Sequence, residues 1–253
     1  MADVGKIFDA LNVFCPFEVH EPWDNVGLLV GERAAEVKKA AVVLDITADA
    51  VKQAHALGAQ LIVSHHPVIF NAIKRLEPSD PVYLLASFNM NAVCAHTNLD
   101  CADGGVNDVL ARLLELEKVQ KVHSDEAETP ILRMGELEKE LSPEAFAHYV
   151  GEKLGCHVRF AGSGRKIKRV LLCGGAGGEF FADAAAESCE AIVTGEIKHH
   201  EFLGAAACGV TAVEAGHFET ENPVVEVLKN YLEGAVPEVG FFTLPVEPPT
   251  RFV

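Results

Sequence analysis

The chain has 253 residues, of which 49% are apolar and 23% are charged, and its 21 basic and 37 acidic residues give a net charge of −16. This balance excludes a disordered tail, a collagen-like rod and a coiled coil. The acidity also argues against a general attraction to nucleic-acid backbones.

The longest apolar runs are too short or too broken to supply the ~20 residues that span a bilayer. The N-terminus lacks a basic segment followed by an unbroken apolar core, so it does not resemble a secretory signal. The seven cysteines stand at positions 15, 94, 101, 156, 173, 189 and 208 without a C-x-x-C pair. Such a set indicates free thiols in a reducing cytosol and argues against a zinc ribbon. We therefore expect a cytoplasmic protein without a membrane span.

Strands alternate with helices through the first half of the chain. The runs 40–46, 59–67 and 91–100 are rich in apolar and β-branched residues, as expected of parallel strands buried on both faces. Between the first two runs, Thr47 is placed to cap a helix that ends at Gly58. A second helix is predicted over 81–89.

The alternation loosens at 123–165 and then returns. Strands are predicted at 131–137, 156–162, 169–175, 189–196 and 210–217. Helices are predicted at 141–155, with Ser142 as cap and Pro143 in the first position, at 179–188 and at 199–209. The basic run at 165–169 is interpreted as a solvent-exposed segment that leads into a strand, and not as a nucleic-acid-binding patch.

The two halves repeat the same order of elements, so we predict two related three-layer α/β domains with mostly parallel sheets. We expect the first domain to comprise residues 1–122 and the second to comprise residues 123–253. In open α/β sheets, binding sites lie beyond the carboxyl ends of the strands. Most of the notable polar residues follow predicted strands, so we expect them to converge on a site between the two domains.

The most distinctive of these residues form the segment Ser64-His65-His66-Pro67. Adjacent residues of a strand point to opposite faces, so two consecutive histidines can share a pocket only where the strand ends. Pro67 keeps His66 away from helical geometry. The alternative is a pair of surface histidines in a loop.

Two further clusters favour a metal site. His96 and Asp100 close another predicted strand, and His217 and Glu221 have the i, i+4 spacing that places both on one face of a helical turn. Acids at a helix N-terminus would alone explain Glu221. Three histidines with an Asp and a Glu suit borderline to hard divalent ions, and five ligands exceed what one catalytic zinc uses. A pair of ions with an activated water fits this number better.

Five sequence blocks carry a resemblance to a known family: WDNVGLLVG (23–31), LIVSHHPVIF (61–70), AHTNLDCADGGVND (95–108), TGEIKHHE (194–201) and EAGHFETE (214–221). Together they resemble the YbgI-like dinuclear metal-centre family. That family is also called GTP cyclohydrolase I type 2-like, and it includes the eukaryotic NGG-one-interacting-factor-three proteins. Glu196 stands where many relatives have Asp, and the long insertion that some members carry between the halves is missing.

The resemblance implies a ligand set of His65, His66, Asp100, His217 and Glu221 for two divalent ions per subunit, with zinc, iron and manganese all open. It also implies a toroidal homohexamer whose metal pairs face an inner cavity.

Several neighbouring residues are candidates for supporting roles. His96 and His200 are predicted as catalytic residues that orient the ligands or move protons. For His200, as for His199, a polar position at a helix start is the alternative. Asp24 and Asn25 could cap a turn beside the site.

Asp45 could be a helix cap or a pocket acid, and Cys101 is interpreted as a bystander. The glycine-rich run 174–178 could cradle a phosphate at a helix N-terminus, or it could let the helix approach the sheet; both interpretations stay open.

We therefore expect a metal-dependent hydrolase of a small nucleotide-like or phosphorylated substrate, and the family label suggests GTP ring opening. The alternative is a non-catalytic metal-binding or regulatory assembly protein that acts through protein partners. Nucleic acid is the least expected partner, because the chain is strongly acidic.

Overall fold

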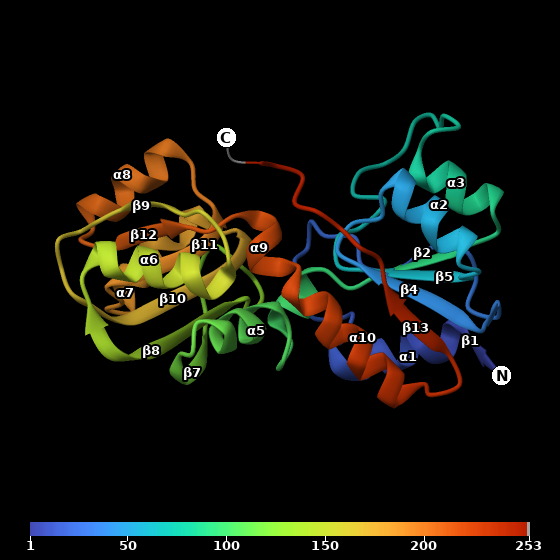
Figure 1. Ribbon diagram of the computed structural model, residues 1–253, viewed down its shortest axis with the longest axis horizontal. Helices are drawn as coiled ribbons and strands as arrows, with labels where there is room; N and C mark the ends of the chain where they lie inside the picture. The colour runs from blue at the N-terminus through green and yellow to red at the C-terminus, as the bar shows by residue number, and fades with distance from the viewer. Residues whose placement is uncertain (252–253) are drawn as a thin grey trace. The chain divides into compact units, whose positions relative to one another are not determined.

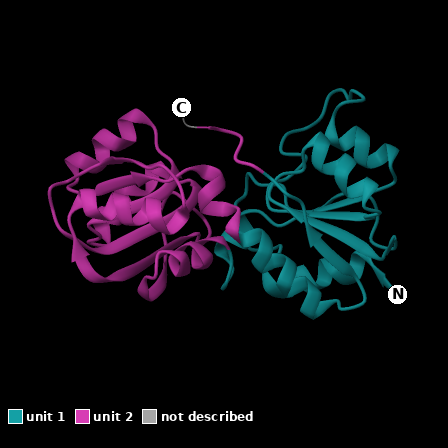
Figure 2. Cartoon of the chain, in the orientation of Figure 1, with its two compact units in different colours: residues 1–105, 224–246 teal, residues 106–223, 247–253 magenta. Residues whose placement is uncertain are grey.

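The computed structural model describes residues 1–251, which form two compact units (Figure 2). Of the described residues, unit 1 comprises 1–105 and 224–246, and unit 2 comprises 106–223 and 247–251. The division differs from the boundary expected after residue 122, because the chain leaves unit 1 earlier and later returns to it. The return adds the C-terminal strand to the sheet of unit 1, a long-range pairing that periodicity along the chain does not reveal.

Unit 1 is built on a five-stranded sheet in the order β13-β4-β5-β6-β2. The strands are β2 (Gly27–Val30), β4 (Lys39–Val43), β5 (Leu61–Ser64), β6 (Asn91–Cys94) and β13 (Gly240–Thr243). All pair in parallel except β2, which runs antiparallel to β6. A separate antiparallel pair joins β1 (Ala2–Asp3) to β3 (Glu36–Val37).

Helices cover both faces of this sheet, so unit 1 has three layers (Figure 1). The helices α2 (Ala48–Ala56) and α3 (Pro81–Ser87) lie on one face, and α1 (Val4–Phe14) and α10 (Pro223–Ala235) lie on the other. Every residue of β5 and β6 is buried, because parallel strands between two helical layers have no solvent face.

Local signals set the helix ends of unit 1 as predicted. The Thr47 side chain accepts a hydrogen bond from the Ala50 N–H, and α2 ends just before Gly58, whose φ is +80°. The strand predicted over 91–100 is wrong beyond Cys94. There the chain turns at His96 into the short helix α4 (Thr97–Cys101), whose Asp100 N–H donates to the His96 carbonyl.

Unit 2 contains a six-stranded sheet in the order β7-β8-β10-β11-β12-β9. The strands are β7 (Glu117–Val122), β8 (Leu132–Leu141), β9 (Arg159–Ala161), β10 (Ile167–Ala176), β11 (Ala191–Glu196) and β12 (Thr211–Glu214). The central β10, β11 and β12 are parallel, whereas β7, β8 and β9 pair antiparallel at the two sides. The expected α/β class with mostly parallel sheets is confirmed.

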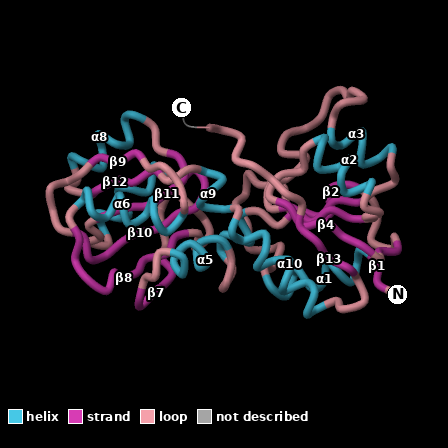
Figure 3. Tube along the Cα trace, in the orientation of Figure 1, coloured by secondary structure: helices cyan, strands magenta, loops and turns pink. Residues whose placement is uncertain are grey.

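Two apolar cores lie on the two faces of this sheet. One core includes residues of α5 (Val106–Leu113) and α6 (Pro143–Leu154), and the other includes residues of η1 (Gly178–Phe180), α7 (Phe181–Ala186) and α8 (His199–Ala207). Ser142 caps α6 as predicted by accepting from the Ala145 N–H. The short helix α9 (His217–Glu221) follows β12 (Figure 3).

Across residues 1–251, each helix is either too short or too polar to cross a bilayer.

Candidate metal centre

The carboxyl end of β5 holds two consecutive histidines in an extended conformation. The N–H groups of His65 and His66 donate to the carbonyls of Val43 and Leu44, at 3.2 and 2.9 Å, so the pairing with β4 continues past the end of the strand. The Ser64 hydroxyl donates to the His66 carbonyl at 2.7 Å. The His65 side chain is 1% exposed and that of His66 is 22% exposed. The two rings are therefore fixed, and one of them is fully buried.

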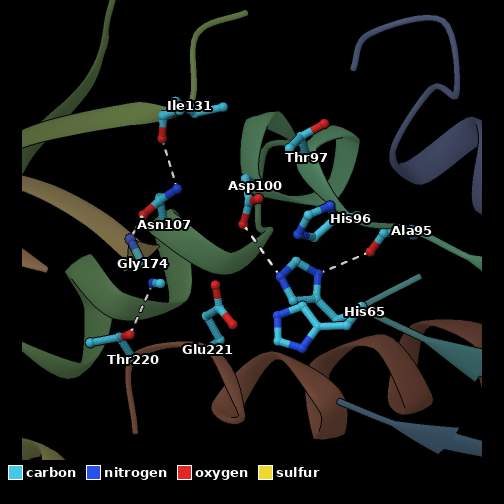
Figure 4. A network of polar contacts seen from close by, with 12 residues as sticks. His65, Ala95, His96, Thr97, Asp100, Asn107, Ile131, Gly174, Thr220 and Glu221 are labelled. Atoms are coloured by element: carbon cyan, nitrogen blue, oxygen red, sulfur yellow. Dashed lines mark hydrogen bonds and ion pairs between the residues drawn. The ribbon is translucent and has the colours of Figure 1, made fainter. Parts of the chain in front are cut away.

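A third imidazole, from the residue before α4, and a carboxylate from α4 join them. The ring centroid of His96 lies 5.1 Å from that of His65 and 5.5 Å from that of His66. One ring nitrogen from each of these histidines lies within 4.8 Å of the others, a geometry that could hold a metal ion. Asp100 Oδ1 is 3.7 Å from His65 Nε2 (Figure 4). Unit 1 thus brings together four of the seven predicted site residues.

The three histidines share one hydrogen-bonding pattern, in which Nδ1 faces an oxygen acceptor. The acceptors are the Ala95 carbonyl at 3.0 Å for His65, Asp45 Oδ1 at 2.8 Å for His66 and Asp24 Oδ1 at 2.8 Å for His96. Because these oxygens only accept, each Nδ1 must carry a proton, and in the neutral ring the lone pair then lies on Nε2. Metal-binding histidines in proteins are held in this way.

Asp24 anchors His96 more firmly than a turn cap would. Its side chain is fully buried, and it accepts hydrogen bonds from His96 and from both the backbone N–H and the hydroxyl of Thr97. Burial alone would raise the pKa of Asp24, but the hydrogen bonds from His96 and Thr97 outweigh it and lower the pKa to about 2. Asp24 is therefore an anion that fixes the tautomer of His96.

Unit 2 supplies one imidazole and one carboxylate from α9, the short helix that follows β12. His217 Nε2 lies 3.0 Å from Glu221 Oε2, as the i, i+4 spacing predicted. His217 Nδ1 faces Glu196 Oε1 at 2.8 Å, which repeats the pattern seen in unit 1. The Glu221 side chain is 5% exposed and that of His217 is 36% exposed. Two ligand atoms thus lie side by side, close enough to share a cation.

The glycine-rich run 174–178, which begins within the last residues of β10, allows α9 to pack closely against the strand. Gly175 has a φ of +64°, and a Cβ at this position would lie 2.2 Å from Glu221 Oε1 and 3.3 Å from His217 Nε2. Its N–H donates to the Thr220 hydroxyl at 3.1 Å, and the Gly174 N–H donates to Asn107 Oδ1 at 2.7 Å (Figure 4). Because side-chain oxygens occupy these N–H groups, the structure favours close packing over a phosphate cradle at this run.

His200 stands apart from the other predicted residues. It lies in the first turn of α8 with a side chain that is 77% exposed, and its Nε2 is 3.9 Å from Glu201 Oε1. Among the described residues, the groups with metal-binding geometry do not include it. Its neighbour His199 is also exposed.

Two acids outside the predicted ligand set support its histidines. Asp45 accepts from His66 although the sequence suggested a helix cap as readily as a pocket acid. Glu196, the last residue of β11, accepts from His217. The sequence signal for Asp45 is an acid directly after an apolar run, and that for Glu196 is its place in the family resemblance, where many relatives have Asp.

The donors found in the two units are imidazoles and carboxylates, which suit borderline to hard divalent cations. The chain is therefore an α/β protein with candidate metal ligands after the carboxyl ends of parallel strands in each of its two units. A profile of the family Duf34/NIF3 (NGG1p interacting factor 3) matches residues 2–249. The chain belongs to the Duf34/NIF3 family, which confirms the resemblance seen in the sequence blocks.

Relatives and solved structures agree with this assignment. A protein named GTP cyclohydrolase 1 type 2 homolog from Clostridium acetobutylicum is 31% identical over 250 residues, which cover 94% of this chain and 93% of the relative. A hypothetical protein from Staphylococcus aureus superposes with a TM-score of 0.90 at 26% identity, covering 99% of both chains. A Bacillus cereus protein related to NIF3 shares the fold with a TM-score of 0.91 at 19% identity, again over 99% of both chains.

Proposed function

We propose that this protein binds two divalent cations and uses them to hydrolyse a small nucleotide-like or phosphorylated substrate. The proposed ligands are His65, His66, Asp100, His217 and Glu221, acting as one set. The observation that carries the proposal is the common orientation of the three ligand histidines. Each has its Nδ1 within 3.0 Å of an oxygen acceptor, so each can present an Nε2 lone pair to a cation.

Two ions fit the number of donors better than one. A single catalytic zinc uses three protein ligands and keeps one position open, so five donors exceed its need. Two bound divalent ions supply Lewis acidity and lower the pKa of a water molecule to near neutrality. Zinc, iron and manganese all suit imidazole and carboxylate ligands, and the metal is left open.

The remaining polar residues hold and orient this ligand set. Asp45 and Glu196 fix the rings of His66 and His217 through Nδ1. His96 is proposed to accept or donate a proton at Nε2, because buried Asp24 keeps its Nδ1 protonated. A proton-transfer role for His200 stays a prediction, since its ring is mostly exposed.

Membership of the family supports the proposed substrate class and the proposed assembly. Relatives carry the name GTP cyclohydrolase 1 type 2 homolog, so GTP is the first substrate to test. A shared fold and metal pair serve many hydrolyses, which is why phosphoesters belong in the same panel. We also propose a toroidal homohexamer working in the cytoplasm, and light scattering of the purified protein tests the assembly.

Metal content is the first test of the proposal. Protein purified without added metal, or dialysed against zinc, manganese or iron, is expected to hold about two ions per chain by mass spectrometry of the elements. The double variant His65→Ala/His217→Ala should lose both ions. His148→Ala, which removes an exposed histidine on α6, should keep them. A content near zero in the loaded wild-type protein contradicts the metal site.

Turnover is the second test. Metal-loaded protein is expected to hydrolyse GTP or a phosphoester, and the double variant should lose roughly a hundredfold or more of that activity. The His148→Ala protein should match the wild type. Activity that survives in the double variant eliminates the proposed site. Two ions per chain without turnover on the whole panel would instead favour the non-catalytic metal-binding alternative.

A further inference from the structure

Two large aromatic side chains lie exposed next to the imidazole cluster of unit 1. Trp23 is 58% exposed and Phe70 is 49% exposed, although side chains of this size are normally buried for most of their surface. Their ring centroids are 5.9 Å apart. The Trp23 ring also meets His96 edge to face, with centroids 6.1 Å apart. An aromatic surface therefore adjoins the residues proposed to bind metal and move protons.

The backbone around both rings is held in place. The side chain of Asn25 donates to the Ile69 carbonyl at 2.6 Å, which ties the residues after Trp23 to the residue before Phe70. Directly after Trp23, the buried Asp24 carboxylate accepts hydrogen bonds from the backbone N–H and the hydroxyl of Thr97. The two rings are thus presented to solvent from fixed positions. A side chain exposed only because its loop is loosely packed would not have such anchors.

An exposed, anchored aromatic pair is suited to one kind of ligand. Planar heterocyclic bases stack on aromatic side chains, and this interaction tolerates different bases because every base has a π face. Small-molecule sites combine such apolar surfaces with a few fixed polar groups, here the imidazoles of His65, His66 and His96.

We propose that Trp23 and Phe70 form a stacking platform for the planar base of a nucleotide. The platform would hold the base while the rest of the nucleotide extends toward the imidazole cluster. The inference rests on the proposed function, because it narrows the substrate to phosphorylated compounds that carry a heterocyclic base. It distinguishes them from sugar phosphates and alkyl phosphates, which have no planar aromatic base to stack.

The composition of the chain gives a direct probe of this site. Trp23 is the single tryptophan, so the tryptophan emission of the whole protein comes from the proposed platform. Zinc-loaded protein is titrated with GMP and, in parallel, with ribose 5-phosphate, which carries the same phosphoryl group without the base. GMP is expected to change the emission saturably, and ribose 5-phosphate is expected to leave it unchanged.

Variants separate stacking from other causes. Phe70→Ala should weaken GMP binding by about fivefold or more, as loss of one stacking partner does. Trp23→Phe, which keeps an aromatic face, should retain most of the affinity by calorimetry, whereas Trp23→Ala should lose about as much as Phe70→Ala. Phe160→Ala is the matched control, because Phe160 is 40% exposed on β9 of unit 2.

Three results would overturn the platform. They are equal responses to GMP and ribose 5-phosphate, unchanged GMP affinity in Phe70→Ala, and a changed oligomeric state of Phe70→Ala in light scattering, which would make the pair a subunit contact. Metal content is measured on the same samples. Two ions per chain with a Trp23 emission that does not respond to GMP refute the platform alone. Missing ions refute the proposed function, and the response of the same sample to GMP then supports or refutes the platform.

Discussion

The two units place the same five-residue pattern after the third parallel strand of each, yet they use it differently. The pattern is a histidine followed four residues later by an acid: His96 to Asp100 after β6 and His217 to Glu221 after β12. In unit 1 the histidine is the residue before the helix, whereas in unit 2 Gly216 takes that place and the histidine is the first helical residue.

This shift of one position changes which groups meet. Each residue of a helix turns by about 100°, so moving the helix start by one residue redirects every following side chain. Asp100 consequently lies near His65, whereas Glu221 lies beside the histidine of its own helix. Identical spacing in the sequence therefore does not guarantee identical pairs of donor groups.

The anchors of the two histidines differ as well. His96 is held by Asp24, a fully buried carboxylate from the N-terminal part of unit 1. His217 is held by Glu196, whose side chain is 62% exposed at the end of the neighbouring strand. The carboxylate that holds the histidine is thus buried in unit 1 (Asp24) and exposed in unit 2 (Glu196).

The largest expected loss of stability comes from adding a side chain at Gly175, where the Glu221 side chain packs. Gly175→Ala places a methyl group 2.2 Å from Glu221 Oε1 in a backbone with a φ of +64°. Overpacking together with the left-handed conformation should lower the free energy of unfolding by about 2–4 kcal/mol. Chemical denaturation measures this loss, and displacement of Glu221 should also reduce the metal content.

A matched glycine in unit 1 is the control for that experiment. Gly58 has a φ of +80° and open space where a Cβ would lie. Gly58→Ala should therefore lower the free energy of unfolding only by the cost of a left-handed backbone conformation, about 1–2 kcal/mol. If Gly175→Ala destabilises no more than Gly58→Ala and keeps its metal, the close packing of Glu221 is irrelevant to the site.

Exchanging the two anchors for amides should separate stability from metal affinity. Asp24→Asn removes a buried charge that accepts three hydrogen bonds and should cost about 1.5–3 kcal/mol of unfolding free energy in metal-free protein. Glu196→Gln affects an exposed pair and should cost less than about 1 kcal/mol, yet it should weaken metal binding by about 10–100-fold through His217. Chemical denaturation measures the unfolding free energy of each variant, and metal titration measures its metal affinity. Equal losses in the two variants would contradict the contrast between the anchors.

The smallest effect concerns the thiols, which report on the interior of each unit. Unit 1 has three cysteines, all buried, and burial raises the pKa of Cys15 to about 12. In unit 2, Cys208 is exposed, whereas burial raises the pKa of half-buried Cys156 to about 11. A raised pKa keeps a thiol protonated and slow to react. At mildly alkaline pH, a thiol reagent should therefore modify Cys208 rapidly and the other cysteines slowly.

Cys208→Ser is the control for the thiol experiment, because it should abolish the rapid phase while denatured protein still reacts throughout. A rapid phase that persists in this variant would show that one of the buried thiols is accessible, and peptide mapping would assign it to a unit.

Local features were predictable because their causes lie within a few residues. The Thr47 and Ser142 caps, the parallel strands and the His217–Glu221 pair each depend on neighbours along the chain. The extended His65–His66 pair was likewise signalled by the strand before it and by Pro67. By contrast, the run 91–100 was predicted as one strand, although only its residues before His96 form an apolar run and the polar residues from His96 onward begin the turn into α4.

The sequence alone determined the α/β class, the family and the chemical identity of the donor groups, because each follows from residue type and short-range order. Only the tertiary structure decided how the rings are oriented. Asp24 is 72 residues from His96, and Ala95 is 30 residues from His65. The periodicity of the sequence does not indicate contacts between residues so far apart. Hydrogen bonds between distant segments form only when the sheets bring strand ends together, and these bonds determine which nitrogen of each histidine is available to a cation.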